Sequence, residues 1–459
     1  MTVKADQTRR GVLGRLQIRH LYPLIVLALF PLAAIGPIRD NSFLWHVRAG
    51  EAQWDQGQVL TTDVFSYSMA DAVWRTQSWL AELSYSGLEA ITGSVGWAPA
   101  MVALVGGVAI ALIGIAVYSA TGSTFTTALW MFIAVWLAAP FANPRPVIFS
   151  YLLLTALVLV LRLDDRLLWA VPALMWVWAA VHGSWVIGIG LLVLVAIQRR
   201  SWRLASLAGV SLVAVSLTAH GLGVWQILLD FMANRDALAF LVEWSPPAFG
   251  DIVQGPYLLV VAGIVVAAVR GRISLNDLWV VIPFLLVGLT TQRTVFPAAI
   301  ILLPYAALAV DVKVPIGSGK RNSRVAWIMA VVATAIGVGV LLRPVDAFDD
   351  ERFPTDDLLA SLETDRFFHD DAVGGYLIYR DWPAAQVYID DRAELYGAEF
   401  FEDYRAARLG SYEEVFERYE MREAIVKPKW PLGDVLLRDG WTVTYEDDFF
   451  AVMRSPEGT

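Results

Sequence analysis

Residues 37–63, PIRDNSFLWHVRAGEAQWDQGQVLTTD, follow directly after an apolar stretch that we expect to be the first membrane span. Asp40 lies where that span ends, and the polar, helix-like segment after it carries Trp45, His46 and Arg48. A carboxylate at the edge of a membrane bundle is costly to keep there, so an acid in this position is a functional candidate. The stretch therefore predicts a polytopic α-helical membrane protein whose first loop is ordered and carries chemistry.

The composition of the whole chain agrees with a membrane protein. Of its 459 residues, 57% are hydrophobic, 19 are Trp, and the mean hydropathy is +0.54. Several apolar runs approach the length that crosses a bilayer. With no cysteine, the chain has no disulfide framework, thiolate nucleophile or cysteine metal site. The basic first 20 residues and the missing small-residue cleavage site predict a retained first span with a cytoplasmic N-terminus.

The charges divide the chain into two parts. From Arg343 to the C-terminus there are 28 acidic and 13 basic residues, a net charge of −15, whereas the preceding 342 residues have 16 acidic and 22 basic residues, a net of +6. Such a shift marks a domain boundary. We predict a transmembrane domain over 1–342, which includes the extracytoplasmic loop 38–94, and an acidic soluble α/β domain over 343–459. The acidic tail argues against nucleic acid as a partner.

Hydropathy predicts about eleven spans. They lie at roughly 20–38, 95–118, 125–141, 147–163, 167–181, 185–198, 203–219, 256–270, 275–291, 294–311 and 325–342. Basic residues then fall on alternate loops, which places those loops in the cytoplasm. They are Arg162 and Arg166; Arg199, Arg200 and Arg203; Arg270 and Arg272; and Lys313, Lys320, Arg321 and Arg324. The count requires a turn at His182-Gly183-Ser184 in place of one long helix, and it puts the C-terminal domain outside the plasma membrane.

Local patterns predict the remaining elements. In the first loop we expect helices at about 41–56, ending at Gly57, and at about 76–91, lying at the membrane interface. In the tail we expect strands at 374–380, 385–390 and 423–428, helices at 399–419 and 432–438, and a closing hairpin at 441–455.

The run DNSFLWHVRAGE at 40–51 resembles the first extracytoplasmic loop of GT-C glycosyltransferases. These membrane enzymes take sugars from polyprenyl-phosphate carriers, and the oligosaccharyltransferase catalytic subunit and the protein O-mannosyltransferases are examples. HGSW at 182–185, EWSPP at 243–247 and the segment 374–404 are similar to later parts of bacterial relatives. The resemblance implies a GT-C-like bundle with a small extracytoplasmic α/β domain. It also implies transfer of a sugar from a polyprenyl-phosphate donor to a glycan, lipid or protein acceptor at the outer face of the plasma membrane.

The resemblance assigns roles to the first loop. Asp40 is expected to be the general base, and Trp45, His46 and Arg48 are expected to face the acceptor. Asp40 is equally suited to cap the helix that starts near Ser42, and capping is compatible with catalysis. Trp45, His46 and Arg48 also fit an ordinary polar helix beside a membrane.

Four residues at span ends are candidates for substrate binding: Arg145, His182, Glu243 and Arg293. Arginines on the outer side break the positive-inside preference, and a lipid phosphate explains them, because Arg binds phosphate with two parallel hydrogen bonds. The alternatives are snorkelling and an ion pair inside the bundle, with Glu243 as one possible partner.

The sequence leaves open whether the protein binds a metal ion. Asp63, together with Asp40, has the oxygen ligands that Mg²⁺ or Mn²⁺ would use, but Asp63 also fits a turn cap. The later loops contain no clear DxD pair. In the tail, Asp390, Asp391, Arg392 and Tyr396 follow an expected strand, where α/β domains often place binding residues, but we favour a solvated turn with an ion pair.

Two other function classes remain. A membrane transporter or lipid flippase would use the same buried charges to line a path, although matched Gly/Pro-broken spans in two halves are absent. A catalytically silent scaffold with the GT-C fold would keep the architecture without the reaction.

Overall fold

The computed structural model describes residues 21–33, 36–163, 165–233, 242–310 and 348–456, with 312, 328, 331, 332, 337, 339, 344 and 345. It is mostly helical (64%) and has a small C-terminal sheet. Contacts divide the chain into two units. The first comprises Met1–Gly36, Trp97–Val215 and Glu243–Pro344, and the second Pro37–Gly96, Ser216–Val242 and Val345–Thr459. The loop that the sequence assigned to the membrane domain therefore groups with the C-terminal part of the chain.

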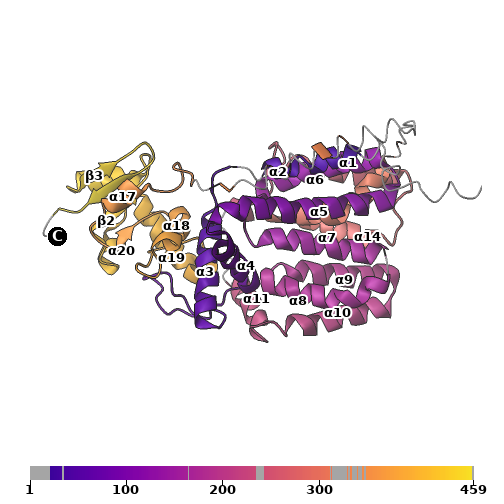
Figure 1. Ribbon diagram of the computed structural model, residues 1–459, viewed down its shortest axis with the longest axis horizontal. Coiled ribbons are helices and arrows are strands. Elements are labelled where there is room, and N and C mark those ends of the chain that lie inside the picture. Colours follow the sequence, from indigo (N-terminus) through magenta and orange to yellow (C-terminus); the bar gives the residue numbers. More distant parts are fainter. Residues whose placement is uncertain are drawn as a thin grey trace, which may run out of the picture. The chain divides into compact units, whose positions relative to one another are not determined.

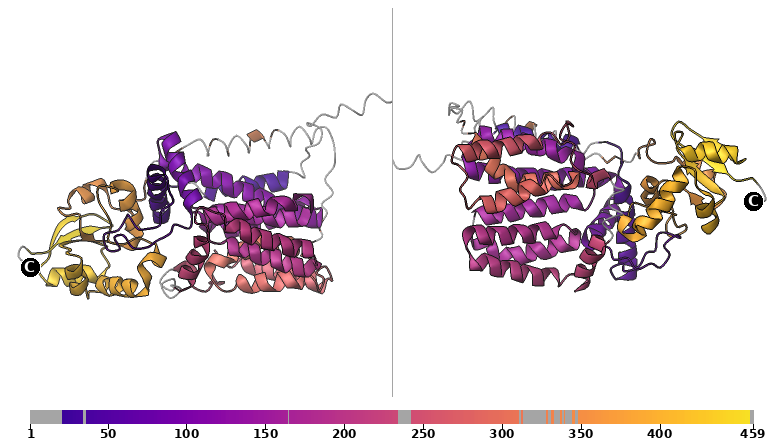
Figure 2. Two further views of the ribbon diagram at one scale, coloured as in Figure 1. Left: turned by 90° about the horizontal axis from the view of Figure 1, so that it is seen from below. Right: turned by 180° about the vertical axis from the view of Figure 1, so that it is seen from behind.

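The first unit is a bundle of apolar helices (Figure 1). Its α-helices are α1 (Leu21–Leu27), α2 (Phe30–Ala33), α5 (Ala98–Thr121), α6 (Thr124–Ala138), α7 (Val147–Leu163), α8 (Val171–Val181), α9 (Trp185–Arg199), α10 (Trp202–Val215), α13 (Tyr257–Val269), α14 (Leu278–Val287) and α15 (Gln292–Ala306). Helices α5, α7, α8, α9 and α10 lie side by side with nearly parallel axes, and Figure 2 shows the same layers from two other sides.

Three helical stretches of the described chain are long and apolar enough to cross a membrane: Val95–Thr121, Thr124–Phe141 and Gln292–Ala309. The other apolar helices have 10–17 residues, which is short for a bilayer core of about 30 Å. The number of about eleven spans therefore stays a prediction. The N-terminal basic cluster, the expected span at 325–342 and the basic residues at 313–324 fall largely outside the described residues.

The expected helix break at His182-Gly183-Ser184 is confirmed. Helix α8 ends at Val181, His182 has extended backbone angles (φ −169°, ψ 144°), and α9 begins at Trp185. The hydroxyl of Ser184 accepts a hydrogen bond from Trp178 Nε1 (3.2 Å), which ties the turn to the preceding helix. Both helices pack against α10.

Glycine permits close helix packing in this bundle. A Cβ atom on Gly106 would lie 2.2 Å from the ring of Phe30, and one on Gly263 would lie 2.5 Å from the ring of Trp130. Small residues let apolar helices approach closely where lipid gives little hydrophobic driving force.

The second unit combines helices with a four-stranded sheet. Its elements are α3 (Asn41–Gln56), α4 (Trp79–Thr92), α11 (Gly223–Ala233), α17 (Asp356–Ala360), β1 (Phe367–Phe368), α18 (Asp371–Asp381), α19 (Ala393–Arg408), α20 (Glu413–Arg418), β2 (Glu423–Val426), α21 (Pro431–Arg438), β3 (Thr442–Glu446) and β4 (Ala451–Arg454). The strand order is β1-β2-β4-β3, with β1 and β2 parallel and the other pairs antiparallel. Helix α3 packs against α4 on one side and α18 on the other.

Several sequence predictions in this unit are confirmed. Helix α3 covers the expected residues and ends at Gly57, which has a left-handed backbone (φ 63°). Strand β2, helix α21 and the closing hairpin of β3 and β4 lie where expected. Helix α4 begins three residues later than predicted.

Three predictions in the tail differ from the structure. The expected strand at 374–380 lies inside helix α18, which is capped by the Asp370 side chain and continues through Gly374 and Gly375. A Cβ on Gly374 would lie 1.9 Å from the Ile389 carbonyl oxygen, so this glycine is needed for packing. The expected strand at 385–390 is reduced to a single bridge at Val387, and the helix at 399–419 is divided between α19 and α20.

Candidate functional site

Asp40 is a helix cap in the second unit. Its Oδ1 accepts a hydrogen bond from the backbone N–H of Phe43 (2.9 Å), as the alternative interpretation predicted. The Asp40 side chain is buried, and its carboxylate interacts electrostatically with the phenol of Tyr85. Burial, together with the carboxylates of Asp40 and Glu82, holds the pKa of Tyr85 well above its usual value.

The first turn of α3 is attached to an acid from the C-terminal part of the chain. Trp45 Nε1 donates to Asp391 Oδ1 (2.8 Å), and the Ser42 hydroxyl donates to Asp391 Oδ2. Asn41 also bonds α18, since its Oδ1 accepts from the N–H of Tyr376 (3.1 Å). Trp45 thus uses its indole N–H within the protein.

His46 belongs to a buried polar network. Its Nδ1 lies 2.9 Å from Glu82 Oε1, which also accepts from the Thr76 hydroxyl, and Gln53 donates to Glu82 Oε2 (2.6 Å). Glu82 is completely buried. The network satisfies this carboxylate and joins α3 to α4.

Arg48 is also engaged within the unit. Its Nε donates to the Tyr379 carbonyl (2.7 Å), its guanidinium lies 4.4 Å above the Tyr379 ring, and its Nη1 pairs with Glu51 (2.5 Å). These contacts anchor α3 to α18. The acceptor-facing role expected for Trp45, His46 and Arg48 stays a prediction, and the observed contacts of all three are within the protein.

Arg392 forms a completely buried ion pair with two carboxylates. Its Nη1 lies 2.7 Å from Asp63 Oδ1, and its Nη2 lies 2.6 Å from Asp390 Oδ2. Burial disfavours the charge of Arg392, but the two carboxylates outweigh it and hold its pKa well above the usual value. The guanidinium also lies 4.6–5.6 Å from the rings of Trp45, Phe65 and Trp74. The turn expected to be solvated is therefore a buried core element.

This arrangement bears on the expected metal site. Asp63 accepts hydrogen bonds from Arg392, from the N–H of Phe65 (3.2 Å) and from the N–H of Ser66 (3.0 Å). Its carboxylate thus has protein donors on both oxygens. Within the residues that the structure describes, no group of three or more His, Cys, Asp or Glu side chains is arranged to hold a metal. A metal at Asp63 and Asp40 stays a prediction.

A second acidic group lies at the start of α18. Burial is the main factor that raises the pKa of Asp371, to about 8, and the adjacent Asp370 adds to the effect. Asp370 itself pairs with Lys427 (2.9 Å), and hydrogen bonds and nearby cations outweigh burial and lower its pKa. Asp371 is therefore largely protonated at neutral pH, whereas Asp370 is ionised.

The span-end candidates converge in the first unit. Arg145 Nη1 lies 3.4 Å from Glu243 Oε1, and Arg293 Nη1 lies 3.2 Å from the same oxygen. Arg293 Nη2 also lies 3.2 Å from His182 Nε2, and its guanidinium lies 5.2 Å from the Trp244 ring centroid. Two guanidinium groups thus share one carboxylate, and about a third of each of these three side chains is exposed. The ion pair with Glu243 that the sequence left as an alternative is present, and both arginines take part in it.

A buried hydroxyl adjoins this arginine cluster, which we define as Arg145, His182, Glu243 and Arg293. Tyr151, on α7, is 2% exposed, and the charges of Arg293, Glu243 and Arg145 act on its phenol. Within the described chain its hydroxyl has no hydrogen-bond partner. A buried polar atom without a partner is rare, so the Tyr151 hydroxyl is a donor available to a ligand beside the arginines.

Sequence reasoning missed several of these residues. Asp391 was assigned to a solvated turn, and Glu82 and Tyr151 looked like ordinary members of an amphipathic helix and an apolar span. A signal for Glu82 existed, because it lies three residues from both Trp79 and Tyr85 on one helix face, and an acid on such an aromatic face requires a partner. No sequence signal identified the partners of Asp391 or the position of Tyr151 beside the arginine cluster.

No protein-family model matches this chain, and no curated protein sequence matches it.

Proposed function

We propose that this protein is a membrane glycosyltransferase of the GT-C type. It would transfer a sugar from a polyprenyl-phosphate donor to an acceptor hydroxyl at the outer face of a plasma membrane, through a bundle of about eleven spans. The observation that carries the proposal is the arginine cluster, in which two guanidinium groups share one carboxylate at the ends of apolar helices.

The reaction assigns a separate role to each group. The Asp40 carboxylate removes the proton of the acceptor hydroxyl, and the acceptor oxygen forms a bond to the anomeric carbon. The bond from that carbon to the phosphate oxygen breaks, and the lipid phosphate leaves with the electron pair. Arg145 and Arg293 stabilise the additional negative charge on the leaving phosphate.

The geometry of the cluster supports phosphate as its ligand. Two guanidinium groups lie within 3.4 Å of one carboxylate oxygen, and His182 adjoins one of them, so two arginines are held together at one place. Partial exposure leaves the guanidinium groups reachable, and Arg can replace one carboxylate oxygen by a phosphate oxygen without losing its planar geometry.

A catalytically silent scaffold is the second candidate. It is favoured by the capping role of Asp40 and by the protein donors that occupy Asp63. Such a protein would bind the donor through the arginine cluster and release no sugar from it.

The test is turnover of a radiolabelled panel of polyprenyl-phosphate sugars in proteoliposomes. We compare the wild type with Asp40→Asn, because Asn caps a helix as well as Asp does and the variant keeps α3 intact. We expect the wild type to transfer the sugar of one donor and Asp40→Asn to lose about 100-fold or more of that rate. Unchanged transfer by a folded Asp40→Asn protein would reject Asp40 as the base.

Donor binding separates the remaining outcomes. The silent scaffold predicts donor binding that is lost in Arg293→Gln and no sugar release in any variant. A transporter or lipid flippase predicts movement of intact donor between leaflets, measured in the same vesicles.

A further inference from the structure

A pocket lies at the end of the first unit that is opposite to the arginine cluster. Three helices show this, because each begins at the cluster and ends at the pocket. Helix α7 follows Arg145 and carries Arg162 in its last turn, α9 follows the turn at His182 and ends at Arg199, and α15 begins with Gln292-Arg293 and carries Tyr305 near its end. The 17 residues of α7 separate the two ends by about 25 Å.

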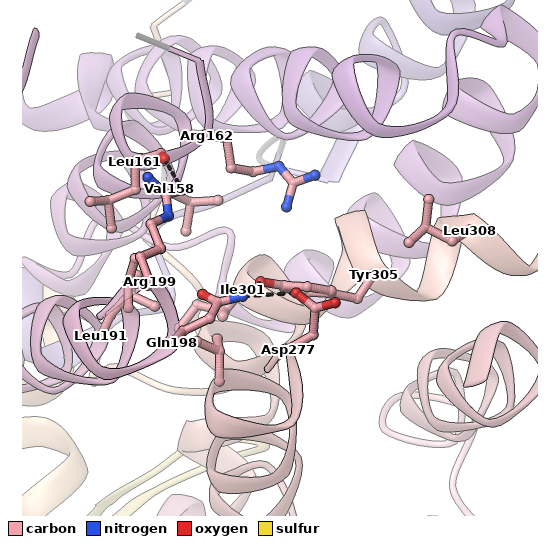
Figure 3. Close-up of a pocket in the computed structure, with 12 residues that line it drawn as sticks. Val158, Leu161, Arg162, Leu191, Gln198, Arg199, Asp277, Ile301, Tyr305 and Leu308 are labelled. Atoms are coloured by element: carbon pink, nitrogen blue, oxygen red, sulfur yellow. Dashed lines mark hydrogen bonds between the residues drawn. The ribbon is translucent and has the colours of Figure 1, made fainter. Parts of the chain in front are cut away.

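The pocket joins an apolar wall to a basic rim (Figure 3). Its volume is about 310 Å³. Leu161, Leu191, Ile301 and Leu308 line the apolar part, and Arg162, Gln198, Arg199 and Asp277 supply the polar groups. All of them belong to the first unit.

Arg162 is the unusual member of this pocket. In Figure 3 its guanidinium points into the open space between the helices. Its Nε is buried, and among the described residues it has no hydrogen-bond partner, while the guanidinium carbon lies 5.5 Å from the centroid of the Tyr305 ring. A buried guanidinium nitrogen without an acceptor is costly, so an acceptor from a ligand would stabilise it.

The one carboxylate of the pocket lining is already occupied. Asp277 Oδ1 accepts from Gln198 Nε2 (2.8 Å), and Oδ2 accepts from the N–H (2.8 Å) and hydroxyl (2.6 Å) of Ser274. Arg199 donates to the Leu161 carbonyl. In the described part of the chain no ion pair joins Asp277 to Arg162 or Arg199, so the pocket has two guanidinium groups and one satisfied acid.

We propose that this pocket binds the phosphate of an anionic phospholipid. The two arginines can donate hydrogen bonds to the phosphate oxygens, and the leucine and isoleucine side chains can contact the first part of the acyl chains. Basic pockets between membrane helices are known to bind such head groups. A volume of about 310 Å³ holds a head group, and the chains would leave along the apolar helices. The site is distinct from the arginine cluster and does not depend on the proposed glycosyl transfer.

The test measures lipid binding to the purified full-length protein. The protein is placed in nanodiscs of phosphatidylcholine with increasing phosphatidylglycerol at constant ionic strength, and its unfolding temperature is recorded. We expect phosphatidylglycerol to raise the unfolding temperature, and we expect Arg162→Gln to require about 10-fold more of this lipid for the same increase.

Arg203→Gln is the matched control, because Arg203 is an exposed arginine near the same end of the unit and its Nη2 donates to the Asp165 carbonyl (3.1 Å). We expect this variant to respond like the wild type. Leu308→Trp fills the pocket without removing a charge, and we expect it to lose the lipid response even if Arg162→Gln folds poorly.

Three outcomes would overturn the proposal. The first is an equal lipid response in wild type, Arg162→Gln and Leu308→Trp. The second is an equal loss in Arg203→Gln, which would indicate a general attraction of basic residues to an anionic surface. The third is a full stabilisation by inorganic phosphate alone in phosphatidylcholine discs, which would identify a free anion as the ligand.

Discussion

Arg392 in the second unit and Arg293 in the first are both paired with carboxylates, but the two pairs differ in burial and in charge. Arg392 is completely buried between Asp63 and Asp390 and is surrounded by aromatic rings. Arg293 shares Glu243 with Arg145, and about 30% of its side chain is exposed. The first arrangement is inaccessible, whereas the second is partly exposed and places two guanidinium groups beside one carboxylate. We therefore expect an arginine to bind a ligand where it is accessible and shares its carboxylate with a second arginine.

The largest expected effect separates these two roles through stability. Arg392→Met leaves two buried carboxylates without a cation and should lower the free energy of unfolding of the second unit by about 3–5 kcal/mol. Arg293→Gln removes a partly exposed charge and should change stability by less than about 1 kcal/mol. Chemical unfolding in detergent, followed by the fluorescence of the many Trp residues, measures both. Similar losses would remove the distinction.

The second effect is on binding. Arg293→Gln should weaken binding of a polyprenyl-phosphate donor by about 10- to 100-fold, because one charge-assisted hydrogen bond to phosphate is lost. Arg418→Gln is a matched control, since Arg418 is exposed and pairs with Asp403 and Glu414. Binding is measured by quenching of tryptophan fluorescence on titration with the donor. If Arg293→Gln bound donor as tightly as the wild type, the assignment of the cluster to phosphate would fail.

The third effect tests how tightly the segment that carries Asp390 is packed. Gly374→Ala would place a Cβ 1.9 Å from the Ile389 carbonyl oxygen, next to Asp390, and should destabilise the second unit by about 1–3 kcal/mol. Gly87→Ala is the matched control, because Gly87 lies inside α4 and a Cβ there meets nothing within 4 Å. Ala is the better helix residue, so the control should be neutral or stabilising.

The smallest expected effect is a pH dependence of stability caused by Asp371, a buried carboxyl group beside Asp370. Asp371 has a pKa raised from 3.8 to about 8, so it binds a proton more tightly in the folded state than in the unfolded state. Its contribution to stability is complete below pH 3.8 and is lost as the pH rises through 8. Burial lowers the pKa values of His369 and His220, so these two residues affect stability only below about pH 6.5.

Between pH 6.5 and 8.5 we therefore expect the unfolding temperature to fall in the wild type by a few degrees and to stay level in Asp371→Asn, which is always neutral. Thermal unfolding at fixed ionic strength measures this slope. An equal slope in both proteins would mean that another group causes it.

The sequence predicted a substantial part of the second unit. Helix α3 was predictable because Asp40 caps its start and Gly57 ends it, and the hairpin of β3 and β4 was predictable from two short apolar runs with a turn between them. Helix α18 was not, because YLIY has the β-branched and aromatic composition of a strand. The cap at Asp370 and the close contact of Gly374 with Ile389 decide for a helix, and that contact joins residues that local patterns cannot place together.

The candidate sites divide in the same way. The sequence identified Arg145, His182, Glu243 and Arg293 one by one as polar residues at span ends, which the cost of charge near lipid makes conspicuous. It left open whether Glu243 neutralises the arginines, because that depends on how many arginines reach one carboxylate. It also interpreted Arg392 as a residue of a solvated turn, although the structure buries it completely.

Local sequence patterns are enough to predict the apolar helical character, the acidic C-terminal region, the helix break at His182 and the polar candidates at the span ends. These follow from local composition, because hydropathy, capping and charge act over a few residues. Only the folded structure shows which carboxylate meets which arginine and that Trp45 bonds Asp391. It also shows that Arg162 points into a pocket, where its Nε has no hydrogen-bond partner among the described residues. Ion pairing and burial depend on distances between residues far apart in the chain, and only the folded packing sets those distances.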